Sequence, residues 1–308
     1  MSDVSQNSAA NLAETGEVTL SAPCKVNLTL DIFPPRPDGY HDLDSVVAKF
    51  DYPADIVKVS VRPGPSRILL LCKDKSLPRD ERNLAVRAAQ IYREAFPMSS
   101  ENTLYIRLEK RLPQQAGLGG GSSDAAAVLR AMQTLFGAAS EDKLREVAAG
   151  IGSDVPLFLV DGMVRMQGRG EQVTPLSGEL PQQPVLHGIL VKPDVGVPTP
   201  AAYAALDSLA GRQPGEATAR MREVLHQGTG VEEIAEAMGN DFEPVILPRY
   251  PEIAAAHRAV REAGALRALL CGSGASVFGL ARDREHAREL ARQLAGKFPF
   301  VKIATSSE

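Results

Sequence analysis

The segment GLGGGSSDAA, residues 117–126, places four glycines within five positions and follows them with two serines and an aspartate. The residues after it have the composition of a helix that ends at Gly137. Glycines let a backbone approach an anion closely, and the free N–H groups at a helix start face such an anion. The segment predicts either a loop that binds a polyphosphate or a tight turn whose glycines serve only packing.

Two common glycine-rich phosphate loops do not match this segment. A Walker A loop ends in Lys followed by Ser or Thr, and that pair is absent here. A dinucleotide-binding loop needs a third glycine where Ser122 stands, and it follows a buried strand rather than the polar stretch KRLPQQA. If the loop binds phosphate, it belongs to another class.

Composition limits the kind of partner. The chain has 308 residues, 44% of them hydrophobic, and 34 Lys and Arg against 38 Asp and Glu, which gives a net charge of -4. No basic block or basic stripe with interleaved aromatic residues occurs, so we expect no nucleic-acid partner. The length favours about two domains with a full core.

Targeting and redox signals are weak. The first 16 residues lack the apolar core of a secretory signal, and no apolar run has the length of a membrane span, so we expect a cytoplasmic protein with no membrane partner. Cys24, Cys72 and Cys271 are far apart and lack metal-site spacing, so we expect reduced thiols.

A strand is predicted from Cys24 to Ile32 because apolar and polar side chains alternate along it. Lys25, Asn27 and Thr29 then share one face. Short strands follow at residues 45–52 and 55–61, then a helix near 79–96, a strand at 102–110 and helices at 122–137 and 140–152.

The C-terminal part predicts an order of helix, two strands, helix and strand over residues 252–306. This order is typical of an α+β sandwich of the ferredoxin-like kind. A change of domain is expected near residues 165–185, where glycine and proline are frequent.

Four stretches resemble the GHMP kinase superfamily in order and spacing: APCKVNLTL at 22–30, PQQAGLGGGSSDAA at 113–126, GSDVPLFL at 152–159 and GSGASVFGL at 272–280. The resemblance implies the two-domain α+β GHMP kinase fold. Its N-terminal ATP-binding domain, like the second domain of ribosomal protein S5, would span 16–170, and a ferredoxin-like substrate-side domain 171–308. Residues 1–15 would form a flexible tail.

The stretches DGYH, NLAVRAA, VPTPAAY and NDFEP resemble one branch of that superfamily. That branch phosphorylates the 2-hydroxyl of a cytidine diphosphate-linked methylerythritol with ATP, a step of non-mevalonate isoprenoid synthesis. The resemblance implies a small-molecule substrate with a cytidine diphosphate group. Two alternatives stay open: another GHMP small-molecule kinase, of the homoserine or mevalonate type, and a non-catalytic nucleotide-binding protein on the same fold.

The resemblance implies two catalytic residues. Asp154 would accept the hydroxyl proton, and the Lys25 ammonium would hold Asp154 ionised and draw on the acceptor oxygen or the γ-phosphate. Taken alone, Asp154 would more often be a cap and Lys25 a solvated strand residue. Cys24 stands where the family has alanine, a change of one small residue for another on the opposite face.

The nucleotide contacts implied by the resemblance come from the glycine loop and one further residue: Gly117, Gly119, Gly120, Gly121, Ser122, Ser123 and Asn83. Mg²⁺ is expected with ATP, and its protein ligands are not predicted because no dedicated carboxylate pair stands out. Asp124 is either a helper to the metal or, as we favour, a charge at the helix start.

The substrate contacts implied by the resemblance are Asn27, Tyr40, His41, Tyr203, Gly272, Ser273 and Gly274. Tyr40 and Tyr203 would stack on cytosine and His41 would bond its edge, whereas an isolated Tyr-His pair in a turn is ordinarily surface decoration. Residues 272–276 could equally form a plain hairpin turn. His187, His226, His257 and His286 lack ligand spacing. NDFEP at 240–244 has no predicted mechanism, and the state is expected to be monomer or homodimer.

Overall fold

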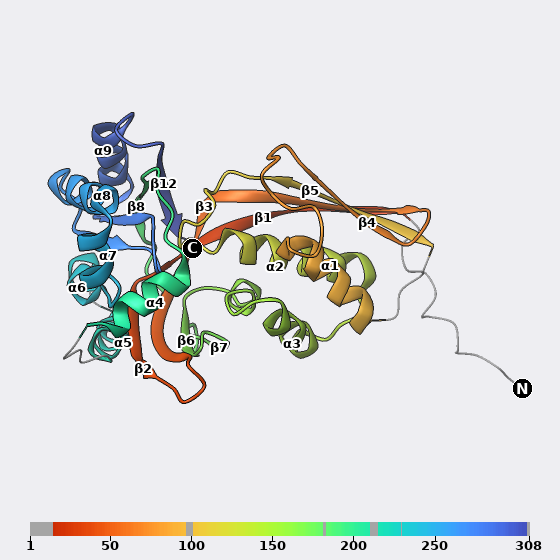
Figure 1. Cartoon of the computed structure of the whole chain (residues 1–308), viewed down its shortest axis with the longest axis horizontal. Coiled ribbons are helices and arrows are strands. Elements are labelled where there is room, and N and C mark those ends of the chain that lie inside the picture. Colours follow the sequence, from red (N-terminus) through yellow and green to blue (C-terminus); the bar gives the residue numbers. More distant parts are fainter. Residues whose placement is uncertain (1–14, 97–100, 181–182, 210–214, 229, 307–308) are drawn as a thin grey trace, which may run out of the picture. The chain divides into compact units, whose positions relative to one another are not determined.

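The structure is a computed structural model that describes residues 15–96, 101–180, 183–209, 215–228 and 230–306 (Figure 1). Apart from Thr15, the tail predicted at residues 1–15 lies outside this range. The chain forms two compact units. The smaller contains the chain up to Ala22, Asp55–Lys110 and Gly121–Val155, and the larger contains Pro23–Ala54, Arg111–Gly120 and the chain from Pro156. Since each unit combines separate stretches, the domain boundary at residue 170 stays a prediction.

Two strands, β1 (Gly16–Asn27) and β3 (His41–Pro63), contribute residues to both units. The smaller unit also has β4 (Arg67–Cys72), β5 (Asn102–Glu109), α1 (Leu84–Ala95), most of α2 (Gly120–Phe136) and α3 (Glu141–Ile151). The remaining strands belong to the larger unit: β2 (Thr29–Pro35), β6 (Val164–Gly168), β7 (Gln172–Pro175), β8 (His187–Lys192), β9 (Gly239–Asn240), β10 (Arg267–Leu270), β11 (Val277–Ala281) and β12 (Phe300–Ser306).

Seven helical segments complete the described part of the larger unit: η1 (Pro156–Leu159), α4 (Thr199–Asp207), α5 (Glu216–Gln227), α6 (Val231–Ala237), α7 (Glu243–Arg249), α8 (Pro251–Glu262) and α9 (Arg284–Leu294). Its sheet runs in the order β10-β11-β8-β12-β3-β2-β9. Helices α8 and α9 contact β8 and β11 of this sheet. This antiparallel layer with helices upon it confirms the predicted α+β sandwich.

The smaller unit is built around β5. This strand pairs antiparallel with the second half of β3 and parallel with β4, and it places Ile106 opposite Val59 in the core. Helix α1 contacts β4 and α3, and the Tyr92 hydroxyl on α1 donates to Gln133 Oε1 on α2 at 2.9 Å. The helices that follow the glycine loop are therefore tied to the sheet.

The predicted strand from Cys24 to Ile32 is two strands, since β1 ends at Asn27 and β2 begins at Thr29. The alternation is correct, but the polar face does not meet solvent: Lys25, Asn27 and Thr29 are as buried as the apolar residues between them. Helix α5 packs on β2, and Gly119 and Gly272 lie against Lys25. Each buried polar group on this face therefore has to find a hydrogen bond. Residues 45–52 and 55–61 were expected as two strands and form one, β3.

Helix boundaries follow local signals closely. Helix α3 begins after Ser140, whose hydroxyl accepts from the Lys143 amide at 3.3 Å. Helix α2 ends before Gly137, which has φ +61° and donates its N–H to Gln133. It starts at Gly120, however, two residues before the predicted start.

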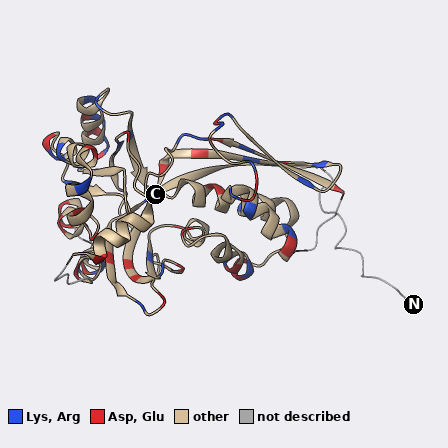
Figure 2. Cartoon of the chain, in the orientation of Figure 1, with Lys and Arg blue, Asp and Glu red and all other residues tan. Residues whose placement is uncertain are grey.

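Charges of both signs are interspersed along both units (Figure 2). None of the described helices is long and apolar enough to cross a membrane. All three cysteines are free, and burial raises the pKa of Cys271 to about 12. Their reduced state stays a prediction.

Candidate active site

The glycine loop is pinned within the larger unit. The Lys25 amide on β1 donates to the Leu118 carbonyl at 3.0 Å, and the Ser276 amide donates to the Ala116 carbonyl at 3.2 Å. Gly117 has φ +74°, and a methyl group on it would overlap the Cys271 carbonyl oxygen. The loop thus lies against the turn after β10, at a distance that only glycine allows.

Gly119 has a second restriction. With φ +72°, its Cβ would stand 3.0 Å from Lys25 Cγ and 3.0 Å from Phe158 Cζ. The backbone therefore passes directly over the lysine stem. Helix α2 starts at the next residue, so the free amides at the head of this helix follow the point where the loop crosses Lys25.

Lys25 is 6% exposed, and its ammonium donates to Asn27 Oδ1 at 2.6 Å. Asn27 in turn donates to Ser45 Oγ at 2.9 Å, and Ser45 donates to the Thr29 carbonyl at 2.5 Å. A Cβ on Gly272 would lie 3.6 Å from Lys25 Nζ. The lysine is thus not a solvated strand residue: it is held between two glycine turns with its head oriented by an amide.

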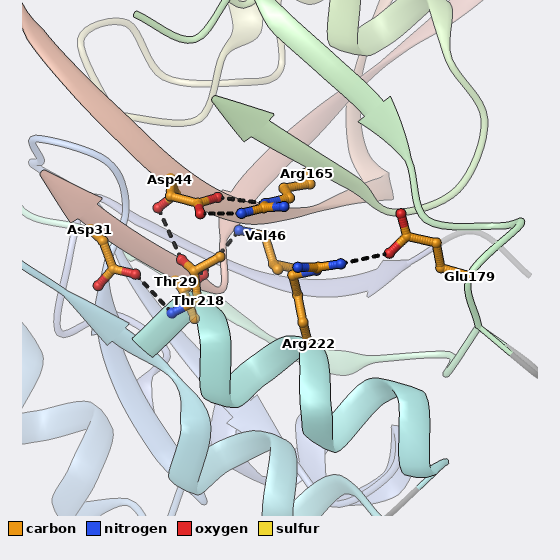
Figure 3. Close-up of polar contacts among 8 residues, drawn as sticks. All are labelled: Thr29, Asp31, Asp44, Val46, Arg165, Glu179, Thr218 and Arg222. Carbon is orange, nitrogen blue, oxygen red and sulfur yellow. Dashed lines mark hydrogen bonds and ion pairs between the residues drawn. The ribbon is translucent and has the colours of Figure 1, made fainter. Parts of the chain in front are cut away.

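A polar network continues from Thr29 (Figure 3). Its hydroxyl lies 2.8 Å from the Thr218 hydroxyl on α5, while the Thr218 amide donates to Asp31 Oδ2 at 2.8 Å and its hydroxyl to the Asp44 carbonyl at 3.0 Å. Arg165 on β6 forms a bidentate pair with Asp44 at 2.8 and 2.5 Å. This network fixes α5 against β2 and β3 and stiffens the strand that follows Lys25 and Asn27.

The turn after β10 contains Gly272, Ser273 and Gly274, and the NDFEP segment holds it. Asn240 Nδ2 donates to the carbonyls of Leu270 and Gly272, each at 2.8 Å, and Glu243 Oε1 accepts from the Leu270 amide at 2.8 Å. Asp241 Oδ2 accepts from the Ile32 amide at 2.8 Å. NDFEP, for which sequence suggested no mechanism, is therefore a clamp on the turn beside Lys25. Ser273 Oγ lies 3.3 Å from Thr199 Oγ1.

His41 of the DGYH turn contacts Tyr203, and both were predicted to bind cytosine. The rings of His41 and Tyr203 have centroids 4.9 Å apart, and Tyr203 packs edge-on to Phe242 at 5.1 Å. Tyr40 is 57% exposed, with the Arg169 guanidinium 4.9 Å from its ring centroid. Stacking of a base between Tyr40 and Tyr203 stays a prediction.

Other predicted residues lie in the smaller unit: Asn83, Gly121, Ser122, Ser123 and Asp154. Gly121 adjoins α1, since its Cβ would be 3.8 Å from Leu84 Cδ1. Asn83 caps α1 by accepting from the Ala85 amide at 3.0 Å, and it donates to the Pro78 carbonyl at 3.1 Å. Asp154 is half-buried in the turn between α3 and η1. Their approach to Lys25, which belongs to the other unit, stays a prediction.

A buried cluster of three charged side chains, Lys110, Asp55 and Asp124, includes one residue near the start of α2. Lys110 Nζ donates to Asp124 Oδ2 at 2.6 Å and to Asp55, whose side chain is fully buried. Burial raises the pKa of Asp124 to about 7 even though Lys110 lowers it. Burial also lowers the pKa of Lys110, but the two carboxylates outweigh it and the net shift is upward. Asp124 is thus an ion-pair partner in the fifth position of α2.

Two buried oxygen atoms at the head of α2, Ser123 Oγ and Asp124 Oδ1, have no hydrogen-bond partner among the described residues. Within that same range, no group of three His, Cys, Asp or Glu side chains could hold a metal ion. The hydroxyl and carboxylate suit Mg²⁺ chemically, but a protein cage of three such side chains is not found there.

Sequence reasoning assigned no role to Ser45, Asp207 and Asn240 of the larger unit or to Lys110 of the smaller unit. Asn240 stood in a noted segment, and Ser45 follows DGYH by four positions, but their partners are distant in the chain. Lys110 and Asp207 had no local signal.

The comparisons with known proteins identify the family. The model of the GHMP kinase N-terminal domain matches residues 83–162, and that of the GHMP kinase C-terminal domain matches residues 221–299. The chain is 40% identical over 271 residues to the 4-diphosphocytidyl-2-C-methyl-D-erythritol kinase of Symbiobacterium thermophilum, covering 88% of this chain and 93% of that relative.

Solved structures agree. The crystal structure of a 4-(cytidine 5'-diphospho)-2C-methyl-D-erythritol kinase is similar at 34% identity with a TM-score of 0.78, covering 94% of this chain and 100% of that one. A homoserine kinase of Cytophaga hutchinsonii, at 21% identity, a TM-score of 0.71 and coverage of 99% and 97%, shares the fold alone. The chain therefore belongs to the GHMP kinases and, within them, to the family of the 4-diphosphocytidyl-2-C-methyl-D-erythritol kinases.

Proposed function

We propose that this protein transfers the γ-phosphoryl group of ATP to the 2-hydroxyl of 4-diphosphocytidyl-2-C-methyl-D-erythritol, giving the 2-phosphate and ADP. The reaction would be a step of non-mevalonate isoprenoid synthesis in the cytoplasm. One observation carries the proposal: the unit that holds Lys25 between two glycine turns also pairs His41 with Tyr203. One unit thus holds both the residues that we propose to face phosphate and the pair that we propose to face the base.

Phosphoryl transfer has a loose transition state, so the protein mainly aligns the two reactants and stabilises negative charge. Amides from Gly117 to Ser123 would bind the phosphates, aided by the positive end of the α2 dipole. Lys25 would stabilise charge on the transferring group. Its position is set before substrate binds, because Asn27 and Ser45 orient its head.

Asp154 would take the proton of the 2-hydroxyl as the oxygen attacks. Asp154 is half-buried in the turn between α3 and η1. Bound Mg²⁺ would neutralise phosphate charge, with Ser123 Oγ and Asp124 Oδ1 as candidate protein ligands and phosphate and water supplying the rest.

On the acceptor side, His41 and Tyr203 would bind the cytosine, with Tyr40 closing over its other face. Asn27, Gly272, Ser273 and Gly274 would line the remainder of the acceptor site. The protein is proposed to act as a monomer or homodimer, without nucleic acid or membrane as partners.

The test is ADP release by the purified protein from ATP with four alcohols: the cytidylyl substrate, methylerythritol 4-phosphate, homoserine and mevalonate. We expect turnover with the first alone, because only it has the cytidine group. Comparable rates with homoserine or mevalonate would overturn the proposal.

The same assay tests the base. Asp154→Asn should lower kcat by about 100-fold or more while ATP binding, measured by calorimetry, stays within about twofold. Asp161→Asn, an exposed carboxylate just beyond η1, is the matched control and should keep near-normal activity. Near-normal turnover of Asp154→Asn would remove Asp154 from this role.

A further inference from the structure

Helix α4 presents two side chains to His41. Tyr203 and Asp207 are four residues apart, hence on one face of the helix. Tyr203 packs on the imidazole with ring centroids 4.9 Å apart, and Asp207 Oδ1 lies 2.7 Å from its Nε2. His41 is 7% exposed, so the ring orientation is set by these two contacts.

The contact with Asp207 determines which ring nitrogen carries the proton. An ionised carboxylate only accepts hydrogen bonds, so Nε2 of His41 must be the donor. In the neutral ring the other nitrogen, Nδ1, then bears a lone pair and can only accept. Nδ1 has no hydrogen-bond partner within the described residues, which leaves it available to a ligand.

This tautomer matches one pyrimidine and rejects another. Cytosine offers an amino group at position 4, which is a donor, whereas uracil has a carbonyl oxygen there, which is an acceptor. An accepting Nδ1 can bond the amino group but faces the carbonyl lone pair to lone pair. A site with a fixed polar group discriminates strongly because the wrong ligand leaves that group unpaired.

We propose that Asp207 is a specificity-determining positioning residue: by holding the proton of His41 on Nε2, it makes Nδ1 an acceptor that selects a cytidine over a uridine nucleotide in the substrate. The inference rests on the proposed function for the identity of the substrate. Asp207 itself would touch only His41, not the base.

The orientation of His41 is further constrained behind Tyr203. Phe242 meets the Tyr203 ring edge-on at an interplanar angle of 88°. The Phe242 amide is bonded by Asn240 Oδ1 at 2.9 Å, which ties this aromatic contact to the NDFEP clamp. The imidazole therefore packs on an anchored aromatic pair, which fixes its position. The remaining role of the Asp207 carboxylate is to determine that Nε2 of His41 carries the proton.

The kinetic test compares kcat/KM for the cytidine diphosphate and uridine diphosphate forms of the substrate. In Asp207→Asn the amide can either accept from or donate to Nε2, so both tautomers become available. The cytidine-to-uridine ratio should fall at least about tenfold, with the KM for ATP unchanged. Asp207→Glu, which keeps a carboxylate, should recover part of the ratio.

Asp42→Asn is the matched control. Asp42, the second residue of β3, follows His41 directly and forms a partly exposed ion pair with Arg36 at 3.1 Å, so this variant should keep the wild-type ratio. A wild-type ratio in Asp207→Asn would overturn the inference, as would an equal loss in Asp42→Asn.

A direct measurement does not depend on turnover or on a variant that folds. The ¹⁵N shifts of His41 in ligand-free wild-type protein at a pH where the ring is neutral should show protonated Nε2 and unprotonated Nδ1. A proton on Nδ1 would overturn the inference. If wild type fails to phosphorylate the cytidylyl substrate, the proposed function fails, and this measurement still decides the role of Asp207.

Discussion

The glycine loop and the DGYH region are built in opposite ways. The backbone at Gly117 approaches the Cys271 carbonyl, and the backbone at Gly119 approaches the Lys25 side chain. Neither glycine position has room for a side chain of its own. Around His41 the geometry comes from the side chains of Tyr203 and Asp207 on α4. A backbone site has no spare volume, whereas a side-chain site can lose one group and keep the rest. The two regions should therefore respond differently to single substitutions.

The largest effect is expected for Gly117→Ala. The added methyl group would overlap the Cys271 carbonyl oxygen, and a backbone atom cannot rotate away. We expect the free energy of unfolding to fall by about 3 kcal/mol or more, with loss of turnover on every acceptor. Urea denaturation and the ADP assay measure both.

Gly137→Ala distinguishes the two effects of Gly117→Ala, which are steric overlap of the new methyl group and backbone strain at positive φ. Gly137 also has positive φ, at +61°, but its Cβ would meet nothing within 4 Å. This control should cost only about 1 kcal/mol and keep activity. If the two variants lose the same stability, the close approach at Gly117 is not what requires glycine.

His41→Ala should have a smaller and one-sided effect. Removing the imidazole empties the contact with Tyr203 without moving the backbone, so KM for the cytidylyl substrate should rise about tenfold or more while KM for ATP stays within about twofold. His226→Ala, on the exposed surface of α5, is the control and should change neither constant. Equal losses for both substrates would contradict the separation of the two regions.

The smallest effect concerns the ion cluster on the helix that continues the loop. Asp124 has a pKa of about 7 in the folded protein against 3.8 for the free carboxyl, because it is buried. The folded state thus binds this proton more tightly between about pH 4 and pH 7, and stability falls as pH rises through that window. In Asp124→Asn the decrease in the free energy of unfolding across that pH window should be smaller than in wild type by about 1 kcal/mol or more.

Lys110 keeps Asp55 as a partner in Asp124→Asn, so the variant should fold. Urea denaturation at pH 5 and pH 7.5 measures the change. Asp142→Asn, whose side chain is 93% exposed and paired with Arg145, is the surface control and should leave the slope intact. An unchanged slope in Asp124→Asn would show that this carboxyl does not titrate in the window.

Much of the fold was predictable because its signals are local. The Ser140 cap, the Gly137 stop and the alternation from Cys24 to Ile32 each depend on a few neighbouring residues. The helix order of the C-terminal part was correct for the same reason. The start of α2 at Gly120 was missed because glycine disfavours helices, and the packed loop before it overrides that preference.

The candidate site was predicted in part. Lys25 and His41 were named by resemblance, but their burial and surroundings were not, since Asp207 reaches His41 and Ser45 reaches Asn27, the partner of Lys25, from distant positions. The polar residues Lys25 and Asn27 of β1 are buried, and Asn27 donates to Ser45 on β3. Period-two alternation cannot reveal this, because alternation distinguishes faces and not their environments.

The sequence by itself determined where the chain turns and which residues have the freedom to do so, because positive φ, capping and side-chain alternation are properties of short segments. It also determined the family, through four motifs in order. Only the tertiary structure decided that Gly117 abuts Cys271, that Asn240 clamps the Gly272 turn and that Asp207 Oδ1 lies 2.7 Å from His41 Nε2. These pairs are separated by 32 to 166 positions, and only folding brings them within bonding distance.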